Sequence, residues 1–372
     1  MSISPAHVSD PLRRVREHRF AEIQDGFTID PRAKEHGVAD PADDAWRVRL
    51  LALRDLVRLG PDAARELTGS LSDATPHVRQ VVAMALGILG SPTSEGALQE
   101  RLAEDPDTIV RAQAAVSLGE LGLPESMARL ALQLDREPSR DVVHRIQLAM
   151  NRIEYGTPSD DAVAGAYAAL DESTFRTAVV GRPALDFELR DTDDRRWRLS
   201  AFRGRPTVLI WIFADWCPVC HHEFHDLIEL RSEFEAHGVN VVTIECHDRY
   251  RCRVMTGQAP SPSHRGYRFA DAPPQEQYRQ RIWWPHLLDP AGAVGATYGV
   301  DPLEFVVHAE WVNRPSTFII DADGVLRFAY VGTFWGDRPS IGETLEIAIS
   351  GRYEFEHPKR LPQPSRTGEA PA

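Results

Sequence analysis

Four cysteines are the residues of this chain best suited to redox chemistry, and all of them fall in its second half. They are Cys217, Cys220, Cys246 and Cys252 in a chain of 372 residues. Two residues separate the first two, a spacing that lets one thiol react with the other. In a reducing compartment such thiols are catalytic or metal-binding before they are structural disulfides. The first pair therefore predicts thiol chemistry.

The residues around this pair predict a helix that activates its first thiol. A continuous apolar run over 207–213 is typical of a strand buried on both faces, and a helical pattern follows over 223–237. A thiol in the first turn of a helix has a lowered pKa, because unpaired amide protons and the helix dipole favour the thiolate. Cys217 would attack, Cys220 would resolve the mixed disulfide, and Trp216 would shield the site.

The other two thiols leave three alternatives open. Cys246 ends a second predicted strand, over 239–246, on the same sheet edge as the first pair. Cys246 and Cys252 could form a second dithiol that exchanges electrons with the first, or the first pair could bind zinc with Cys246 and a histidine. The third alternative, half-buried thiols without such a role, is the one we favour, and we assign no metal or cofactor. His221 is the histidine best placed to modulate the Cys217 thiolate.

The remaining segments of the second half predict an α/β fold. The two buried strands with a helix between them form a right-handed crossover of a parallel sheet. An antiparallel hairpin over 187–199 precedes them, another over 317–331 follows, and a helix over 340–350 closes the order. An insertion over 253–285 forms either a lid beside the active edge or part of the core.

These segments resemble, in kind and order, the thioredoxin-like branch that contains TlpA-type thiol-disulfide oxidoreductases and the AhpC/TSA redoxin group. The resemblance is carried by PALDF at 183–187, LSAFRG at 199–204, WCPVC at 216–220 and RPSTFIID at 314–321. It covers about 170 residues. It implies a thioredoxin fold extended by an N-terminal β-hairpin.

The resemblance also implies site residues and reveals two departures. Pro315 matches the cis-proline that faces the cysteine pair in this superfamily, and the backbone of Arg314 would pair with a substrate chain. Trp211 stands where thioredoxins have a buried acid, so proton transfer would fall to water, Glu245 or a histidine. Ala214 stands where peroxiredoxins have a threonine or serine, which disfavours peroxide reduction.

A different pattern, a helical repeat, fills residues 46–156. Four copies, 30, 32 and 34 residues apart, each hold a residue pair ending in arginine, an apolar helical stripe and a closing glycine. Such a period means stacked helix pairs, with the glycine as C-cap. The unit resembles short HEAT repeats. Its arginines, predicted to bond neighbouring acids within the stack, are Arg49, Arg79, Arg111 and Arg145.

We therefore expect two domains, an all-α HEAT-like repeat array followed by an α/β thioredoxin-like fold with an N-terminal β-hairpin extension. The predicted boundaries are a mostly flexible arm over 1–45 with one short helix, the array over 46–156, a linker over 157–180, the thioredoxin-like domain over 181–355 and a disordered tail over 356–372.

The composition of the chain disfavours some classes of binding partner. The net charge of −13 and the pI near 5.5 disfavour nucleic acid, because phosphate binding needs clustered cations. No apolar run reaches the length of a membrane span, and the first residues lack a signal-peptide core, so we expect no membrane association and a cytoplasmic protein.

The expected function is a thiol-disulfide oxidoreductase that acts on a protein or small disulfide substrate. The array would bind a protein partner or dock on the second domain. Two alternatives are a non-enzymatic interaction protein switched by its disulfide and a peroxiredoxin-like thiol peroxidase. The physiological substrate, the electron donor and the direction of exchange do not follow from the residues.

Overall fold

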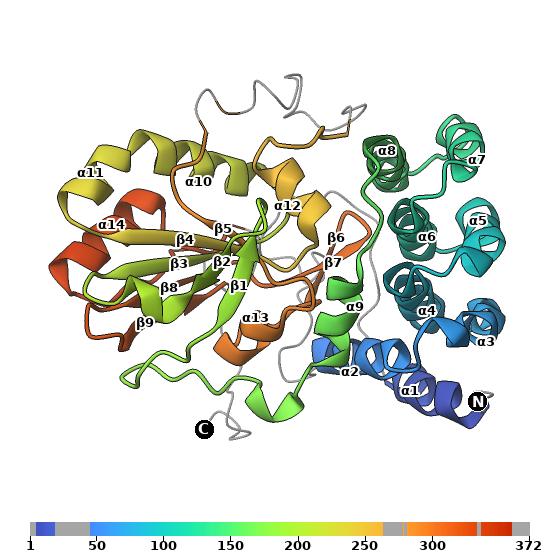
Figure 1. Ribbon diagram of the computed structural model, residues 1–372, viewed down its shortest axis with the longest axis horizontal. Coiled ribbons are helices and arrows are strands. Elements are labelled where there is room, and N and C mark those ends of the chain that lie inside the picture. The colour runs from blue at the N-terminus through green and yellow to red at the C-terminus, as the bar shows by residue number, and fades with distance from the viewer. Residues whose placement is uncertain (1–4, 19–44, 263–277, 279–280, 333–335, 359–372) are drawn as a thin grey trace.

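A stack of helices lies beside a seven-stranded sheet (Figure 1). The computed structural model describes residues 5–18, 45–262, 278, 281–332 and 336–358. The HEAT-like array and the α/β unit both form as the fold class predicts. None of the helices described is long and apolar enough to cross a bilayer.

The array consists of two layers of helices. In Figure 1, α4, α6 and α8 face the sheet, and α3, α5 and α7 form the outer layer. The bounds are α1 (Pro5–Glu17), α2 (Ala45–Val57), α3 (Ala64–Gly69), α4 (Pro76–Leu89), α5 (Glu95–Glu104), α6 (Thr108–Leu121), α7 (Ser126–Leu134) and α8 (Arg140–Tyr155).

The closing glycines end the inner helices as predicted. Gly90, Gly122 and Gly156 follow α4, α6 and α8 with φ values of 63°, 66° and 68°. This left-handed conformation carries little steric cost only for glycine, which is why one recurs in each copy.

The repeated arginines take two roles. Arg79 donates two hydrogen bonds to Asp105 at 2.7 and 2.8 Å, and Arg111 donates two to Glu137 at 3.1 and 2.9 Å. These two bond acids within the stack, as predicted. Arg49 instead reaches out of the array and lies 3.4 Å from the ring centroid of Trp311. Arg145 also extends out of the array and donates to the carbonyl of His308.

The described parts of the segments that flank the array include two α-helices. The predicted linker contains α9 (Asp161–Ala168), which contacts α2 and α4 and buries Val163 and Tyr167 in the core of the array. The N-terminal arm contains α1, whose Arg16 pairs with Asp73. The rest of the arm and most of the predicted tail lie outside the described residues, and the domain boundaries stay predictions.

The sheet has the strand order β2-β1-β5-β4-β3-β8-β9. Strands β3, β4 and β5 are parallel neighbours, and antiparallel hairpins β1–β2 and β8–β9 extend the two sides. The bounds are β1 (Glu188–Asp191), β2 (Arg196–Arg198), β3 (Thr207–Ile212), β4 (Asn240–Glu245), β5 (His286–Leu288), β8 (Ser316–Ile320) and β9 (Leu326–Val331).

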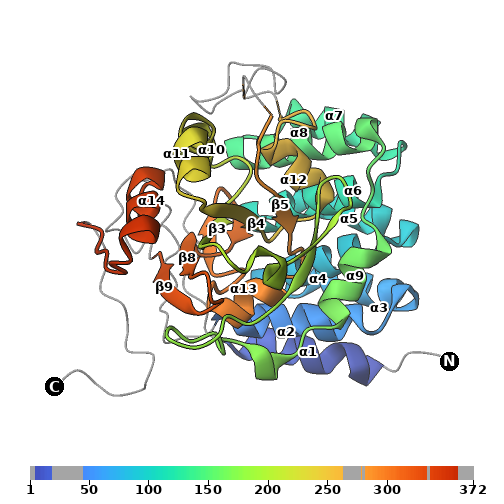
Figure 2. The same cartoon turned by 60° about the vertical axis from the view of Figure 1, so that its left-hand side comes forward.

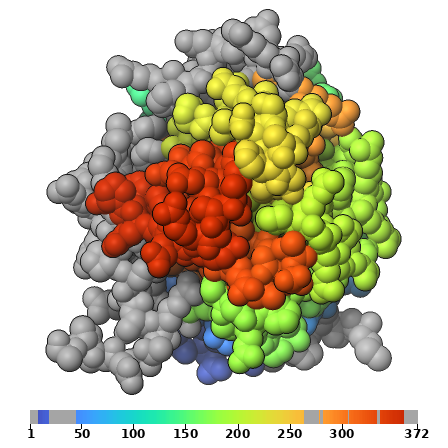
Figure 3. Space-filling model, turned by 90° about the vertical axis from the view of Figure 1, so that its left-hand side faces the viewer, coloured from blue at the N-terminus to red at the C-terminus, as the bar shows by residue number. Residues whose placement is uncertain are grey.

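Helices cover both faces of the sheet. One face carries α10 (Pro218–Glu229), α11 (Arg231–Ala236) and α14 (Ile341–Ser350), on the side away from the array (Figures 2 and 3). Val208 and Ile210 of β3 pack toward that face. Leu209 and Trp211 pack on the other, where Tyr298 of α13 (Ala293–Tyr298) lies. Trp211 thus belongs to the core opposite the cysteine pair.

A small hairpin of the α/β unit, absent from our prediction, contacts the array. It pairs β6 (Phe305–Val307) with β7 (Glu310–Val312). Its turn residues His308 and Ala309 have φ values of 51° and 55°, as a type I′ turn requires, although neither is a glycine or asparagine. Asp141 of α8 contacts His308 Nδ1 at 3.0 Å, and the carbonyl of His308 accepts from Arg145 at 3.3 Å. Contacts with the array therefore hold an unfavourable turn.

Close packing of α6 on α8 gives a test of the array. A Cβ added at Gly119 would lie 2.8 Å from Cα of Ala149, so Gly119→Ala must push the two helices apart. We expect a loss of about 1–3 kcal/mol in unfolding free energy, seen as a Tm lower by several degrees.

The matched control is Gly96→Ala in α5, where nothing lies within 4 Å of the added atom. Because alanine is the better helix former, this variant should gain up to about 1 kcal/mol. Equal Tm values for the two variants would contradict the packing described.

Candidate active site

The two cysteines sit where β3 passes into α10. Cys217 is the N-cap residue of α10, and Pro218 occupies its first position. Both thiols are reduced and hydrogen-bonded to each other. They are also buried, with 1% of Cys217 and none of Cys220 exposed. A substrate therefore reaches them only through a narrow approach or after a local movement.

An ion pair that our sequence reasoning missed lies beneath the thiols. Arg338 Nη1 donates to Glu223 Oε2 at 2.8 Å, and its two terminal nitrogens lie 3.7 and 3.6 Å from Cys220 Sγ. Both side chains are nearly inaccessible. Glu223 follows Cys220 by three residues on α10, so helical spacing could have revealed it. No pattern in the sequence predicts the role of Arg338, which lies in the segment before α14.

The groups around the two thiols shift their pKa values in opposite directions. Burial opposes ionisation of Cys217, but hydrogen bonds from Cys220 and the charge of Arg338 together lower the pKa of Cys217. Burial and the neighbouring Cys217 raise the pKa of Cys220 well above its ordinary value. Burial also raises the pKa of Glu223 to about 8. The site thus contains one thiol with a lowered pKa, one thiol with a raised pKa and one carboxyl group able to exchange a proton near neutral pH.

His221 is held as a neutral ring and not as a cation. Its Nε2 lies 2.6 Å from the carbonyl oxygen of Asp215, and its Nδ1 lies 2.5 Å from the hydroxyl of Tyr278. The carbonyl requires a proton on Nε2, so Nδ1 accepts from Tyr278. Burial lowers the pKa of His221. Its predicted influence on Cys217 would therefore act through position and not through charge.

Trp216 connects the cysteine loop to the array. Its Nε1 donates to Glu310 Oε2 at 2.6 Å, and Arg145 of α8 donates to the same carboxylate at 2.7 Å. The ring of His308 meets the indole edge-on, with centroids 4.8 Å apart. The predicted shield is thus fixed from the side of the array.

Glu310 belongs to a buried charge network beside the site. Arg251 of α12 (Arg249–Met255) bridges Glu310 and Asp215, and His247 lies between Glu310 and Glu245. Burial opposes these charges, but Arg145, Arg251 and His247 hold the pKa of Glu310 well below its usual range. Three cations, Arg145, Arg251 and His247, thus balance three carboxylates, Glu310, Asp215 and Glu245.

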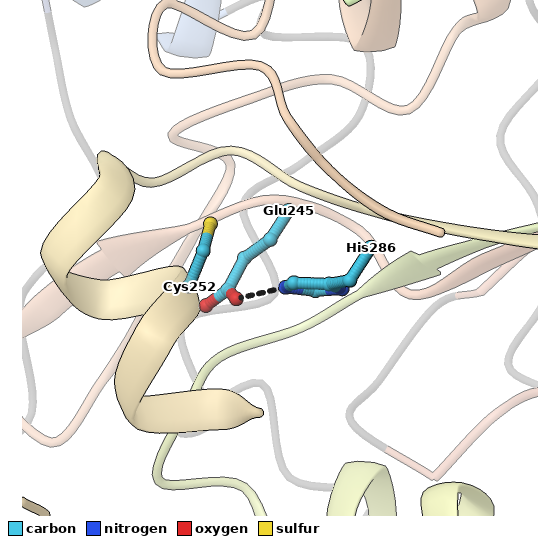
Figure 4. Close-up of side chains that lie close together, drawn as sticks. All are labelled: Glu245, Cys252 and His286. Carbon is cyan, nitrogen blue, oxygen red and sulfur yellow. Dashed lines mark hydrogen bonds and ion pairs between the residues drawn. The ribbon is translucent and has the colours of Figure 1, made fainter. Parts of the chain in front are cut away.

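Cys252 lies beside Glu245 and His286, which are hydrogen-bonded to each other (Figure 4). Glu245 Oε2 lies 3.1 Å from His286 Nε2, and the Cys252 thiol donates to the carbonyl of His247 at 3.7 Å. The ligand atoms of these three residues lie within 4.8 Å of one another, a spacing compatible with a metal ion. However, each of them already has a hydrogen-bond partner, and the cations His247 and Arg251 adjoin them. A hydrogen-bonded hub explains the cluster.

Cys246 does not lie beside the cysteine pair. The dithiol relay and the zinc site considered above both required Cys246 to act together with Cys217 and Cys220. Cys246 packs near Gly292 and Gly295, on the face of the sheet opposite Cys217. Burial raises the pKa of both Cys246 and Cys252 well above the ordinary value. A zinc site or dithiol relay through Cys246 would require side chains to pass between the faces.

The cis peptide bond expected before Pro315 is not present, and this expectation was wrong. No peptide bond in the described residues is cis, so Arg314–Pro315 is trans. The backbone of Arg314 is also occupied, because its N–H donates to the carbonyl of Val300 at 3.0 Å and its carbonyl accepts from Asn313 at 2.9 Å. The extended chain entering β8 is thus paired within the protein, in the less costly isomer, and does not offer Arg314 to a substrate chain.

Comparisons with known families agree with this geometry. The model of the AhpC/TSA family matches residues 180–329, and the model of HEAT repeats matches residues 40–119. Residues 180–329 are an AhpC/TSA redoxin domain. In this chain the redoxin domain follows a HEAT repeat array, as the sequence patterns predicted.

Individual relatives of the redoxin domain are distant and of two kinds. Peroxiredoxin Q from Oryza sativa subsp. japonica is 27% identical over 191 residues, covering 50% of this chain and 76% of its own. The thiol-disulfide oxidoreductase ResA of Geobacillus thermodenitrificans is 28% identical over 161 residues, covering 43% and 74%. Alkyl hydroperoxide reductase E of Mycobacterium tuberculosis is 29% identical over 157 residues, covering 40% and 83%. All three names describe oxidoreductases.

Removing the charge of Arg338 tests its effect on the redoxin thiolate. In Arg338→Gln the pKa of Cys217 should rise, because a nearby cation no longer favours the thiolate. Glu223→Gln should lower it, because a carboxylate that opposes ionisation is gone. The measurement is the pH midpoint of Cys217 alkylation, followed by mass spectrometry.

The matched control is Arg327→Gln on β9, whose arginine is exposed and pairs with Asp321. Its midpoint should equal that of the wild type. Shifts of the same sign in Arg338→Gln and Glu223→Gln would rule out an electrostatic effect of this pair.

The charge network predicts a pH dependence of stability. Although burial and Arg251 oppose it, Glu245 and Glu310 raise the pKa of His247 from 6.5 to about 9. Because the folded pKa exceeds the unfolded one, this stabilisation is complete below about pH 6.5 and disappears as the pH rises through 9. We expect it to amount to about 1–3 kcal/mol.

The measurement is the unfolding free energy of wild type and His247→Gln between pH 6 and pH 10. The difference between the two should shrink across this range. His237→Gln, at an exposed histidine of the same domain, should show no such trend. A constant difference for His247→Gln would mean that His247 is not charged in the folded protein.

Proposed function

We propose that the protein is a thiol-disulfide oxidoreductase in which Cys217 is the nucleophile and Cys220 the resolving thiol. One observation carries the proposal: two thiols in contact at the start of a helix, one with its pKa lowered and the other with its pKa raised. Such a pair attacks through one sulfur and retains a proton on the other until the second step.

The proposed cycle transfers two electrons to the substrate. The Cys217 thiolate attacks one sulfur of a disulfide, the substrate's sulfur–sulfur bond breaks, and the departing thiolate takes up a proton. Cys220 then loses its proton and attacks Cys217 Sγ. This releases the second substrate thiol and leaves a Cys217–Cys220 disulfide. An external dithiol must reduce that disulfide to complete the cycle.

Glu223 is the group proposed to accept the proton of Cys220. Its carboxylate is held against Arg338, which also touches Cys220 Sγ. With a pKa of about 8, Glu223 can take up a proton and release it again near neutral pH. It would thereby replace the buried acid whose usual position Trp211 occupies.

The burial of Cys217 favours a small disulfide as substrate. Trp216 is fixed by Glu310, and the array lies behind it, so a folded protein substrate needs that loop to move. The array would position the hairpin that carries Glu310, and its outer layer stays available to a protein partner. A cytoplasmic location remains part of this proposal.

A thiol peroxidase is the second candidate, favoured by the peroxiredoxin relatives and by a guanidinium beside the thiols. The thiolate would attack one peroxide oxygen and become a sulfenic acid as water or an alcohol leaves. Cys220 would then form the disulfide with loss of water. Ala214, where peroxiredoxins place a hydroxyl, argues against efficient turnover.

Turnover assays separate these functions. Wild type should reduce hydroxyethyl disulfide faster than insulin when dithiothreitol supplies electrons, and Cys217→Ser should abolish both activities. Cys220→Ser should accumulate a mixed disulfide at Cys217. Cys246→Ser is the matched control and should keep wild-type rates.

Other outcomes would overturn the proposal. Peroxide consumption that survives Cys220→Ser but not Cys217→Ser, without disulfide turnover, would favour the peroxidase. A reversible Cys217–Cys220 disulfide with no turnover of either substrate class would favour a redox-switched interaction protein.

A further inference from the structure

A cavity with several charged side chains in its lining lies between the array and the redoxin domain, and neither cysteine of the pair lines it. Its lining includes Glu120 of α6, Arg145 and Arg152 of α8, and Cys246 and His247 after β4. Both domains therefore contribute walls, and neither forms the cavity alone.

Arg145 lines this cavity and has unused hydrogen-bonding capacity. Its side chain is 1% exposed. One terminal nitrogen serves Glu310 and the carbonyl of His308, whereas Nε and Nη1 are buried and have no acceptor among the described residues. A buried guanidinium with two free donors is costly unless something supplies oxygen atoms to them.

The other cations of the lining are already paired with acids. Arg152 pairs with Asp248, Arg251 with Glu310 and Asp215, and His247 with Glu310 and Glu245. Within the described part of the chain, Arg145 is therefore the cation of the lining whose donors still need an acceptor. Burial raises the pKa of Glu120 to about 7, so this group is only partly charged at neutral pH. One of its oxygens is also buried without a donor in the part of the chain that the structure describes.

We propose that this interdomain cavity binds a small oxyanion, a carboxylate or a phosphate, through Nε and Nη1 of Arg145, with Glu120 as a second contact. An oxyanion supplies the acceptors that the guanidinium lacks, and charge-assisted bonds of this kind are the strong ones. The proposal does not depend on the proposed function, although Arg145 also pairs with Glu310, which accepts from Trp216 beside the cysteine pair. Cys246, whose thiol lines the same cavity, serves as a reporter of occupancy.

The test is calorimetric titration of the full chain with sodium phosphate and, separately, with sodium malonate, against sodium chloride at equal ionic strength. Saturable binding of phosphate alone would assign a phosphate site, and binding of malonate alone a carboxylate site. Each would support the proposal. The bound anion should also slow alkylation of Cys246 by iodoacetamide at least threefold.

Three variants locate the site. Arg145→Lys keeps a cation but removes the two free donors and should weaken binding at least tenfold. Glu120→Gln removes a partial negative charge and should tighten binding, which keeps the test valid if Arg145→Lys does not fold. Arg111→Lys, at the equivalent position of the preceding repeat and outside the cavity, should bind like wild type.

Two results would overturn the proposal. One is the absence of saturable binding by both anions, which would leave a cavity filled with water. The other is unchanged affinity in Arg145→Lys together with equal protection of Cys246 by chloride, which would show general screening in place of a site.

Discussion

The buried carboxylate of Glu310 is the charge on which the arrangement of the active loop depends. It accepts from Trp216 beside the nucleophile, from Arg251 of the redoxin domain and from Arg145 of the array. A carboxylate so far from water is stable only while its cations remain in place. Through this one group, the position of a repeat helix and the position of the cysteine loop are fixed together.

The repeat array shows how one sequence feature can take two structural roles. In the central copies, Arg79 and Arg111 bond acids of the next repeat and hold the stack together. At the ends, Arg49 and Arg145 occupy the equivalent positions but contact the β6–β7 hairpin of the redoxin domain. The array thus uses the same side chain for internal cohesion and for docking, according to what lies opposite it.

Local features of the fold could be predicted from the sequence, and features made by distant contacts could not. The glycine C-caps, the buried strand before Cys217 and the hairpin over 187–199 each depend on a few neighbouring residues. The β6–β7 hairpin escaped prediction because His308 and Ala309 give no turn signal, and contacts from α8 hold them in a left-handed conformation. The hydrogen bond of the Arg314 N–H to the carbonyl of Val300 is likewise a distant contact that no local pattern reveals.

The candidate active site likewise has some features that the sequence predicted and others that it did not. The Cys-x-x-Cys spacing and the helix that begins at it predicted which thiol has the lowered pKa. The ion pair that sets its electrostatics did not emerge, since Arg338 lies more than a hundred residues from Cys220 and reaches it only through the fold. Glu223 could have been found by its helical spacing, but its importance depends on the arginine that faces it.

The strained turn at His308 and Ala309 has a consequence for how this protein can diverge. Its conformation and the compensation of the charge of the adjoining Glu310 depend on residues of another domain, so the redoxin domain is not an exchangeable module. A change at Glu310 would need a matching change at Arg145, and the two positions should covary among homologues that keep both domains. Homologues that lack the repeats would be expected to lack this acid as well.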